Sequence, residues 1–311
     1  MARRKNKYRR ALQKGRRYIV YLLALFLRRI LLCLPFTMSF KLCERLASLA
    51  FILLARQRKR IFLNLEYALG EETSETERRI IAKQVFKNAG RSLAEVVCWP
   101  KLGKEHLLSH VTIENPERIL DAYAEGRGVI GLTAHLGNWE YLAAAMANIL
   151  KIRFAVIARY LSNPWLNQIL EKMRGSMGVE MIYRGKEGIA ILRRLKKNHG
   201  LGILADQNIR GDAIIVNFFG KPVKTHKNLA ELILRANAPV VPMFIIRNKD
   251  LTKHRLIVEN SLVYSLTGNK ETDLKIISET YTRAIESIIR RYPEQWMWMH
   301  NRWSIFKKHK M

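Results

Sequence analysis

Short apolar runs rich in β-branched residues alternate with longer amphipathic segments over most of the chain after residue 100. The apolar runs have the length of buried strands, whereas the segments between them repeat their apolar residues every three to four positions, as helices do. This alternation predicts an α/β domain with a mostly parallel central sheet flanked by helices. The expected strands cover residues 128–133, 154–158, 179–183, 201–205, 239–247 and 255–259.

The helices expected between and after these strands cover residues 139–150, 164–177, 187–198, 229–238 and 275–292. An earlier segment, residues 64–98, also has apolar residues at helical spacing. Within it, Ser74 and Glu77 have the spacing of a capping box, which satisfies the free N–H groups at the start of a helix. We therefore expect a helical region to precede the alternating part.

The N-terminal region combines a basic tail with apolar stretches. Residues 1–17 are mostly basic and polar, and Arg28 and Arg29 interrupt the apolar sequence that follows. A spanning helix needs about 20 consecutive apolar residues, so this region suits either a short span or an interfacial helix whose arginines reach the headgroups. A buried helical hairpin of a soluble protein is a third interpretation. The basic tail beside an apolar stretch favours membrane contact.

We accordingly divide the chain into a basic tail with a membrane-associated helical segment, residues 1–60, and an α/β domain, residues 61–311. No convincing signal-peptide cleavage site follows the apolar stretch. The three cysteines are scattered and include no CxxC pair, which argues against a disulfide framework or a structural zinc.

The charge balance narrows the choice of partner. The chain has 55 Lys and Arg residues against 26 Asp and Glu residues, a formal net charge of +29. Such a surface attracts an anionic partner, which could be nucleic acid, anionic lipid or an acidic protein. We find no interleaved basic and aromatic pattern and no known nucleic-acid-binding module, so nucleic acid is the least favoured of the three.

The candidate chemistry lies in the stretch GLTAHLGNWEYLA, residues 131–143. On one continuous helix His135 and Glu140 would point in different directions, since a helix turns every 3.6 residues. They can meet if His135 follows a strand and Asn138 caps a helix that has Glu140 in its first turn. Ligands gather at such strand ends in α/β sheets. A carboxylate beside the imidazole would then orient it as a general base.

Several other kinds of site are disfavoured. The GxGxxG pattern of Gly126, Gly128 and Gly131 precedes and enters a strand, whereas a dinucleotide site needs these glycines after a strand. HLGNWE is not the HExxH pattern of zinc enzymes. No GxSxG nucleophile motif occurs either. The nucleophile is therefore expected to be a hydroxyl of the substrate, which points to direct acyl transfer to an alcohol.

The sequence resembles the lysophospholipid acyltransferase superfamily, and more specifically the lauroyl and myristoyl acyltransferases of lipid A biosynthesis. The resemblance covers most of the chain. It rests on the motifs AHLGNWE, VIARYLSNPWLN, LADQN, FFGKPVKTH, APVVPMF and PEQWMWMHNRW, which occur in this order.

This resemblance implies a glycerolphosphate-acyltransferase-like fold and a role for each matching residue. His135 corresponds to the general base and Glu140 to its acidic partner. Arg159 corresponds to an arginine that binds substrate or stabilises the oxyanion. Substrate-binding positions are also expected at Asn138, Asp206, Gln207 and Thr225. His226 and Lys227 depart from the small residues common in the family, which leaves the details of acceptor binding open.

The resemblance also implies the partners. The acyl donor would be an acyl carrier protein thioester or acyl-CoA, the acceptor an anionic lipid A precursor, and the location the cytoplasmic face of a bacterial inner membrane, with its anionic phospholipids. No metal or nucleotide cofactor is implied. Two alternatives remain: an acyltransferase for another glycolipid or a lysophospholipid, and a non-catalytic basic protein that binds membrane or nucleic acid.

Overall fold

The structure is a computed structural model, and it describes residues 2–183, 187–209 and 211–303. A seven-stranded sheet forms its centre, and neighbouring strands pair in parallel except β8 and β9, which are antiparallel. Its spatial order is β1 (Val111–Glu114), β9 (His254–Val258), β8 (Val240–Arg247), β2 (Val129–Thr133), β5 (Gly200–Leu204), β3 (Phe154–Ala158) and β4 (Glu180–Tyr183). The predicted α/β architecture with a mostly parallel sheet is confirmed.

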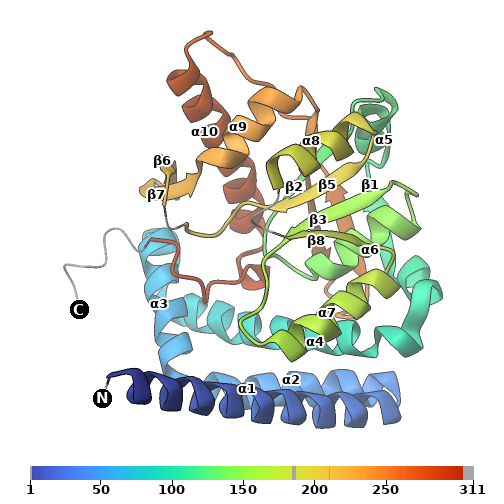
Figure 1. Cartoon of the computed structure of the whole chain (residues 1–311), viewed down its shortest axis with the longest axis vertical. Helices are drawn as coiled ribbons and strands as arrows, with labels where there is room; N and C mark the ends of the chain where they lie inside the picture. The colour runs from blue at the N-terminus through green and yellow to red at the C-terminus, as the bar shows by residue number, and fades with distance from the viewer. Residues whose placement is uncertain (1, 184–186, 210, 304–311) are drawn as a thin grey trace.

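Helices cover both faces of this sheet, as Figure 1 shows. Alternate strand residues point to opposite faces of the sheet, so each strand contributes side chains to two hydrophobic cores, one on each face. Along β8 the two sets are Val240, Phe244 and Ile246 on one face and Val241, Met243 and Ile245 on the other. The first core is shared with α8 (Glu187–Lys196), α9 (Lys227–Ala236) and α10 (Lys270–Arg291), and the second with α5 (Glu117–Ala124) and α6 (Trp139–Asn148).

The sequence pattern did not indicate β1, α5 or the hairpin of β6 (Ala213–Phe218) and β7 (Lys221–His226). The hairpin turns at Phe219 and Gly220, whose φ angles are +54° and +68°. These left-handed angles match the right-handed twist of the strands, and a glycine adopts them without strain. The hairpin packs on α10, where Thr225 and Tyr281 share a buried hydrogen bond of 2.7 Å.

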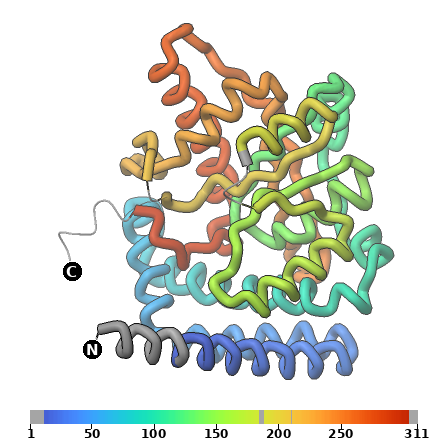
Figure 2. The backbone as a smooth tube through the Cα atoms, viewed as in Figure 1, coloured from blue at the N-terminus to red at the C-terminus, as the bar shows by residue number. Residues whose placement is uncertain are grey.

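Four helices precede the sheet in the chain, and Figures 1 and 2 show the first two lying side by side, with the fourth between them and the sheet. They are α1 (Ala2–Cys33), α2 (Phe36–Leu53), α3 (Ala55–Leu69) and α4 (Glu75–His110). Ser74 and Glu77 form the expected capping box at the start of α4. The proposed division between residues 60 and 61 falls inside α3. Among the described residues, no helix combines the length and apolarity needed to cross a membrane.

The contact between α2 and α4 depends on one glycine. A Cβ added at Gly90 would lie 2.6 Å from both the carbonyl oxygen of Cys43 and the Cβ of Ala47. Only a glycine therefore lets the two helix backbones approach this closely. This packing places α4 between the outer helices and the loop that carries His135.

Candidate active site

The carboxyl ends of three neighbouring parallel strands carry the candidate residues. β2 leads to His135, β5 to Asp206 and β3 to Arg159, and the order β2-β5-β3 makes these strands adjacent. Parallel strands end at the same edge of a sheet, where α/β proteins bind ligands. The fold thus gathers side chains that are far apart in the sequence.

The partner of His135 is Asp206. The imidazole Nδ1 lies 2.8 Å from Asp206 Oδ1, and the backbone N–H of His135 donates to Oδ2 at 3.0 Å. The indole N–H of Trp296 also donates to Oδ2, at 2.8 Å. Burial by itself would raise the pKa of Asp206, but the charge of His135 and the hydrogen bonds from both residues lower it to about 2. The carboxylate is therefore ionised at neutral pH.

This arrangement fixes the imidazole tautomer. The proton on Nδ1 faces Asp206, while the side-chain amide of Gln207 donates to Nε2 at 3.2 Å. Nε2 then carries the lone pair that can accept a proton. The carbonyl of His135 is held by the backbone N–H of Met297 at 2.9 Å. The side chain is 22% exposed, so a substrate can reach it.

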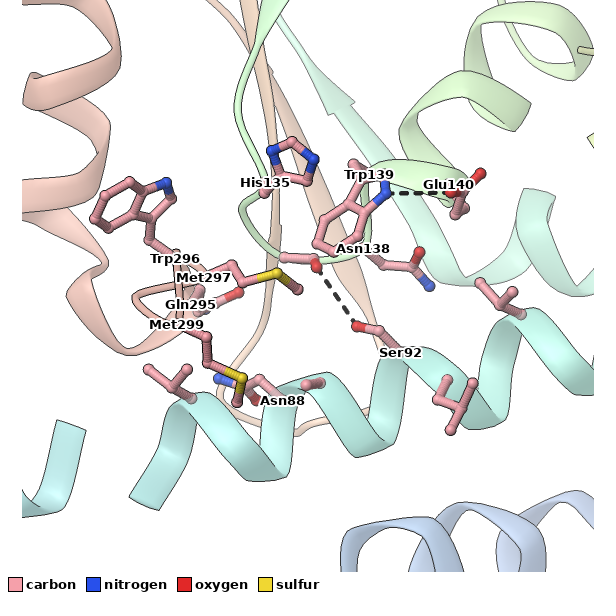
Figure 3. A pocket seen from close by; sticks show the side chains of 15 residues that line it. Asn88, Ser92, His135, Asn138, Trp139, Glu140, Gln295, Trp296, Met297 and Met299 are labelled. Atoms are coloured by element: carbon pink, nitrogen blue, oxygen red, sulfur yellow. Dashed lines mark hydrogen bonds between the residues drawn. The ribbon is translucent and has the colours of Figure 1, made fainter. Parts of the chain in front are cut away.

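Glu140 lies in the first turn of α6, as predicted, but its carboxylate pairs with Arg174 of α7 (Pro164–Ser176) rather than with His135. The guanidinium donates to Oε2 at 2.8 Å and to Oε1 at 2.6 Å, and the Trp139 indole donates to Oε1 at 3.1 Å. In Figure 3 the Trp139 ring lies between His135 and Glu140. The expected contact is thus replaced by a bidentate, charge-assisted pair between the Glu140 carboxylate and the Arg174 guanidinium.

Two more predicted residues have buried side chains. Asn138 is 1% exposed and caps α6, as predicted, by accepting a hydrogen bond from the backbone N–H of Tyr141. Its amide group donates to Glu95 at 2.8 Å. Thr225 is fully buried against Tyr281, because its position on β7 faces α10. The Thr225 side chain is therefore not available to a substrate.

Two cavities meet at His135. The first is an apolar groove of about 210 Å³ between α4 and the His135 loop. Its lining comes from one face of α4 and from the loops opposite, where Figure 3 labels Trp139, Met297 and Met299. The lining residues include Val85, Ala89, Leu93, Val96, Trp139, Met297 and Met299. A groove of this character accepts a hydrocarbon chain.

The second cavity is a cleft of about 1670 Å³ with polar and basic walls. Besides His135, it contains two of the predicted residues, Arg159 and Gln207. Lys224 from β7 and Arg235 from α9 add positive charge. The lining also includes Asp212 and Glu231, so the excess of positive charge is small, and it favours a polar group that carries negative charge.

Some contributors to this site were not expected from the sequence. Trp296 belongs to the tryptophan-rich C-terminal motif PEQWMWMHNRW. It is buried, and in addition it donates to Asp206. The arginine that pairs with Glu140 lies in an ordinary amphipathic helix, so no local signal marked it. Among the described residues, no cluster of His, Cys, Asp and Glu is arranged to hold a metal ion.

An imidazole that stands between a hydrocarbon-lined groove and a polar cleft suits the transfer of an acyl chain to a polar hydroxyl, and this chain is an acyltransferase. It belongs to the bacterial lipid A biosynthesis acyltransferase family, whose profile matches residues 5–305. The resemblance noted from the motifs is therefore confirmed.

Individual relatives are distant but similar over most of their length. The chain is 24% identical over 277 residues to the lipid A biosynthesis palmitoleoyltransferase of Escherichia coli, covering 86% of each chain. It is 24% identical over 284 residues to the lipid A biosynthesis acyltransferase of Haemophilus influenzae, covering 89% of this chain and 85% of the relative. It is also 21% identical over 248 residues to the phosphatidylinositol mannoside acyltransferase of Mycolicibacterium smegmatis, covering 77% of each.

Proposed function

We propose that this protein transfers a fatty acyl chain from an acyl carrier protein thioester to a hydroxyl group of a lipid A precursor. The observation that carries the proposal is the position of His135 at the junction of the apolar groove and the polar cleft. The acyl chain occupies the groove and the anionic acceptor occupies the cleft. The two reacting groups then meet beside the imidazole.

In the proposed reaction, His135 Nε2 takes the proton of the acceptor hydroxyl as the hydroxyl oxygen attacks the thioester carbonyl. Asp206 stabilises the imidazolium that forms, because it is a buried carboxylate 2.8 Å from Nδ1. The tetrahedral intermediate then expels the thiolate, which takes the proton from the imidazolium. An ester bond forms, the thioester bond breaks, and no net proton is gained or lost.

The same proposal gives Glu140 a positioning role. Glu140 accepts the hydrogen bond of the Trp139 indole, and the Trp139 and His135 rings make an edge contact with their centroids 5.1 Å apart. Held by Arg174, the glutamate fixes Trp139 as a wall beside the base. Asp206 then takes the place of the acidic partner that the sequence assigned to Glu140.

Arg159 follows β3 and lines the cleft. We assign it to the acceptor phosphate or to the oxyanion of the intermediate, since a guanidinium binds either with charge-assisted hydrogen bonds. The acidic donor protein is favoured by the net charge of +29. Acyl-CoA remains the alternative donor.

We further propose that α1 and α2 lie in the interface of the cytoplasmic leaflet of a bacterial inner membrane. Ile19, Leu23 and Phe26 recur at helical spacing on α1 and are 59%, 63% and 67% exposed. On α2, Leu49 and Leu53 are 49% and 68% exposed. Exposed apolar side chains on a basic helix are typical of interfacial binding to anionic lipid.

An assay with purified protein tests the reaction. Acyl carrier protein loaded with a fatty acid is mixed with a tetra-acylated lipid A precursor, and free thiol and product mass are measured. We expect thiol release that depends on the acceptor and a mass increment of one acyl chain. His135→Ala should lower the rate about 10²–10⁴-fold with an unchanged circular dichroism spectrum.

The alternatives are separate arms of the same assay. Acyl-CoA replaces the carrier protein in one arm, and a phosphatidylinositol mannoside or a lysophospholipid replaces the acceptor in others. Transfer only in one of these arms would overturn the proposed substrates while keeping the chemistry. A normal rate for His135→Ala, or no thiol release in any arm, would overturn the chemistry itself.

A further inference from the structure

A buried carboxylate behind the candidate site has four hydrogen bonds from other elements. Glu95 of α4 is 1% exposed. Arg247 donates to both of its oxygens, at 2.6 and 2.7 Å. His254 Nε2 lies 3.0 Å from Oε1, and the amide of Asn138 donates to Oε2 at 2.8 Å. A buried charge persists only when it is paired and fully hydrogen-bonded, and Glu95 meets both conditions.

The charges of the Glu95 group, which consists of Glu95, Arg247 and His254, balance. Burial by itself would raise the pKa of Glu95, but the neighbouring His254 and Arg247 lower it well below its usual range. Burial lowers the pKa of His254, and its Nδ1 has no hydrogen-bond partner in the described part of the chain. This is the pattern of a neutral imidazole that donates from Nε2. One carboxylate therefore faces one guanidinium, and Glu95 accepts from every neighbour.

The Glu95 group is connected to the turn that follows His135. The backbone N–H of Gly137 donates to the carbonyl of Gln295 at 3.0 Å, and Ser92 of α4 donates to the carbonyl of Gly137 at 3.5 Å (Figure 3). Gln295 also exchanges two hydrogen bonds with the backbone of Arg247. A Cβ at Gly137 would lie 2.0 Å from the carbonyl oxygen of Ile245, so this turn presses directly on β8.

We propose that Glu95 is a positioning residue for the reaction: through the amide of Asn138, its buried carboxylate fixes the turn that presents His135 to the two cavities. This inference rests on the proposed function. Replacing a buried ion pair with apolar residues often stabilises a protein, so stability alone does not explain the pair of Glu95 and Arg247. It suits orientation, because three directional hydrogen bonds from Arg247 and His254 fix the Glu95 carboxylate, which then fixes the Asn138 amide through the fourth.

The test cuts the link from Asn138 to Glu95 while keeping the helix cap. In Asn138→Ser the hydroxyl still caps α6 but is too short to reach Glu95. The chain offers a matched control in Asn163, which is also buried, caps α7 and donates from its amide to another helix, at the carbonyl of Arg17. Asn163→Ser makes the same chemical change away from His135.

We expect Asn138→Ser to lower kcat at least tenfold with KM within twofold, at a Tm close to that of Asn163→Ser, which should keep its kcat. Glu95→Gln should lower kcat to a similar degree, and the double variant with Asn138→Ser should lose little more, because both changes break one link. If Glu95→Gln does not fold, the two asparagine variants decide the question alone.

A second measurement does not depend on turnover. The rate at which diethyl pyrocarbonate modifies His135, followed by peptide mass spectrometry, should change at least threefold in Asn138→Ser and stay constant in Asn163→Ser. Equal kcat values and equal modification rates in the two variants would overturn the proposal. An inactive wild-type protein would overturn the proposed function instead, and the modification rates would still test the positioning of His135.

Discussion

At the scale of single residues, the candidate site depends on the pair of His135 and Asp206. The aspartate accepts three hydrogen bonds and is almost completely buried. A sequence can indicate that both residues follow strands, but the pairing of the two depends on β2 and β5 being neighbours in the sheet. The sequence predicts Glu140 as the acidic partner of His135, whereas in the structure the carboxylate that contacts the imidazole is Asp206.

Asp206→Asn tests this pair by activity. An amide at this position would favour the wrong imidazole tautomer, so we expect kcat/KM to fall about 10³–10⁴-fold with little change in the circular dichroism spectrum. The measurement is initial-rate kinetics with saturating donor. A loss smaller than that of Glu140→Gln would mean that Asp206 is not the orienting carboxylate.

The same variant tests the lowered pKa of Asp206 by its effect on stability. The folded pKa is about 2, below the ordinary value of 3.8, so the ionised form stabilises the fold. This contribution, about 2 kcal/mol by linkage, is fully present above pH 4 and is lost as pH falls toward 2. Urea unfolding from pH 5 to 2.5 should show a smaller loss of stability for Asp206→Asn than for the wild type, because other carboxylates with lowered pKa values, such as Glu44 and Asp273, titrate in both proteins.

At the scale of secondary structure elements, an ion pair joins α6 to α7. Glu140 and Arg174 are 13% and 16% exposed, so the pair is shielded from solvent. The sequence predicts Glu140 in the first turn of α6, where it lies, because the asparagine cap is a local signal. It could not identify Arg174, since the contact depends on how α7 packs beside α6.

A double-mutant cycle tests the positioning role of this pair. We expect Glu140→Gln and Arg174→Met each to lower kcat about 10–100-fold, by releasing Trp139 from its place beside His135. The double variant should be little worse than either one, because all three remove a single interaction. If the losses of kcat in the two single variants add up in the double variant, the positioning role is contradicted. If kcat is unchanged and only the Tm falls, the pair has a structural role alone.

The apolar face of α4 carries a prediction about chain length. Ala89 lines the groove, and Ala89→Phe would fill part of it. Each methylene that loses its burial costs about 0.8 kcal/mol, so kcat/KM should fall most for the longest acyl donors. Competition between donors of different length measures this, with Ile80→Phe on the exposed side of α4 as the control. An equal loss for all donor lengths would place the acyl chain elsewhere.

At the scale of the whole molecule, α1 and α2 lie side by side on one side of the sheet (Figure 1), and both carry exposed apolar residues. The sequence indicated this region by its composition. The packing of the helices adds that α4 lies between these two helices and the sheet.

Vesicle sedimentation tests this face. Replacing Ile19, Leu23 and Phe26 with glutamate should weaken binding to vesicles of phosphatidylglycerol and phosphatidylethanolamine about 100-fold or more, since each buried apolar side chain contributes about 1.5–3 kcal/mol. Val263→Glu is the control, because Val263 is 86% exposed and lies far along the chain from α1. Unchanged binding of the triple variant would refute the proposed membrane face.

The sequence by itself determined the order and type of most central elements and the residues that follow the strands. It did so because helical and strand periodicities, caps and turns act over a few neighbouring positions. Only the tertiary structure decided which of these side chains meet. His135 pairs with a carboxylate 71 residues away, and Glu140 pairs with an arginine 34 residues away. Glu95 accepts a hydrogen bond from Asn138 in the turn that follows His135. Those contacts depend on sheet order and helix packing, which are properties of the whole chain and leave no local pattern.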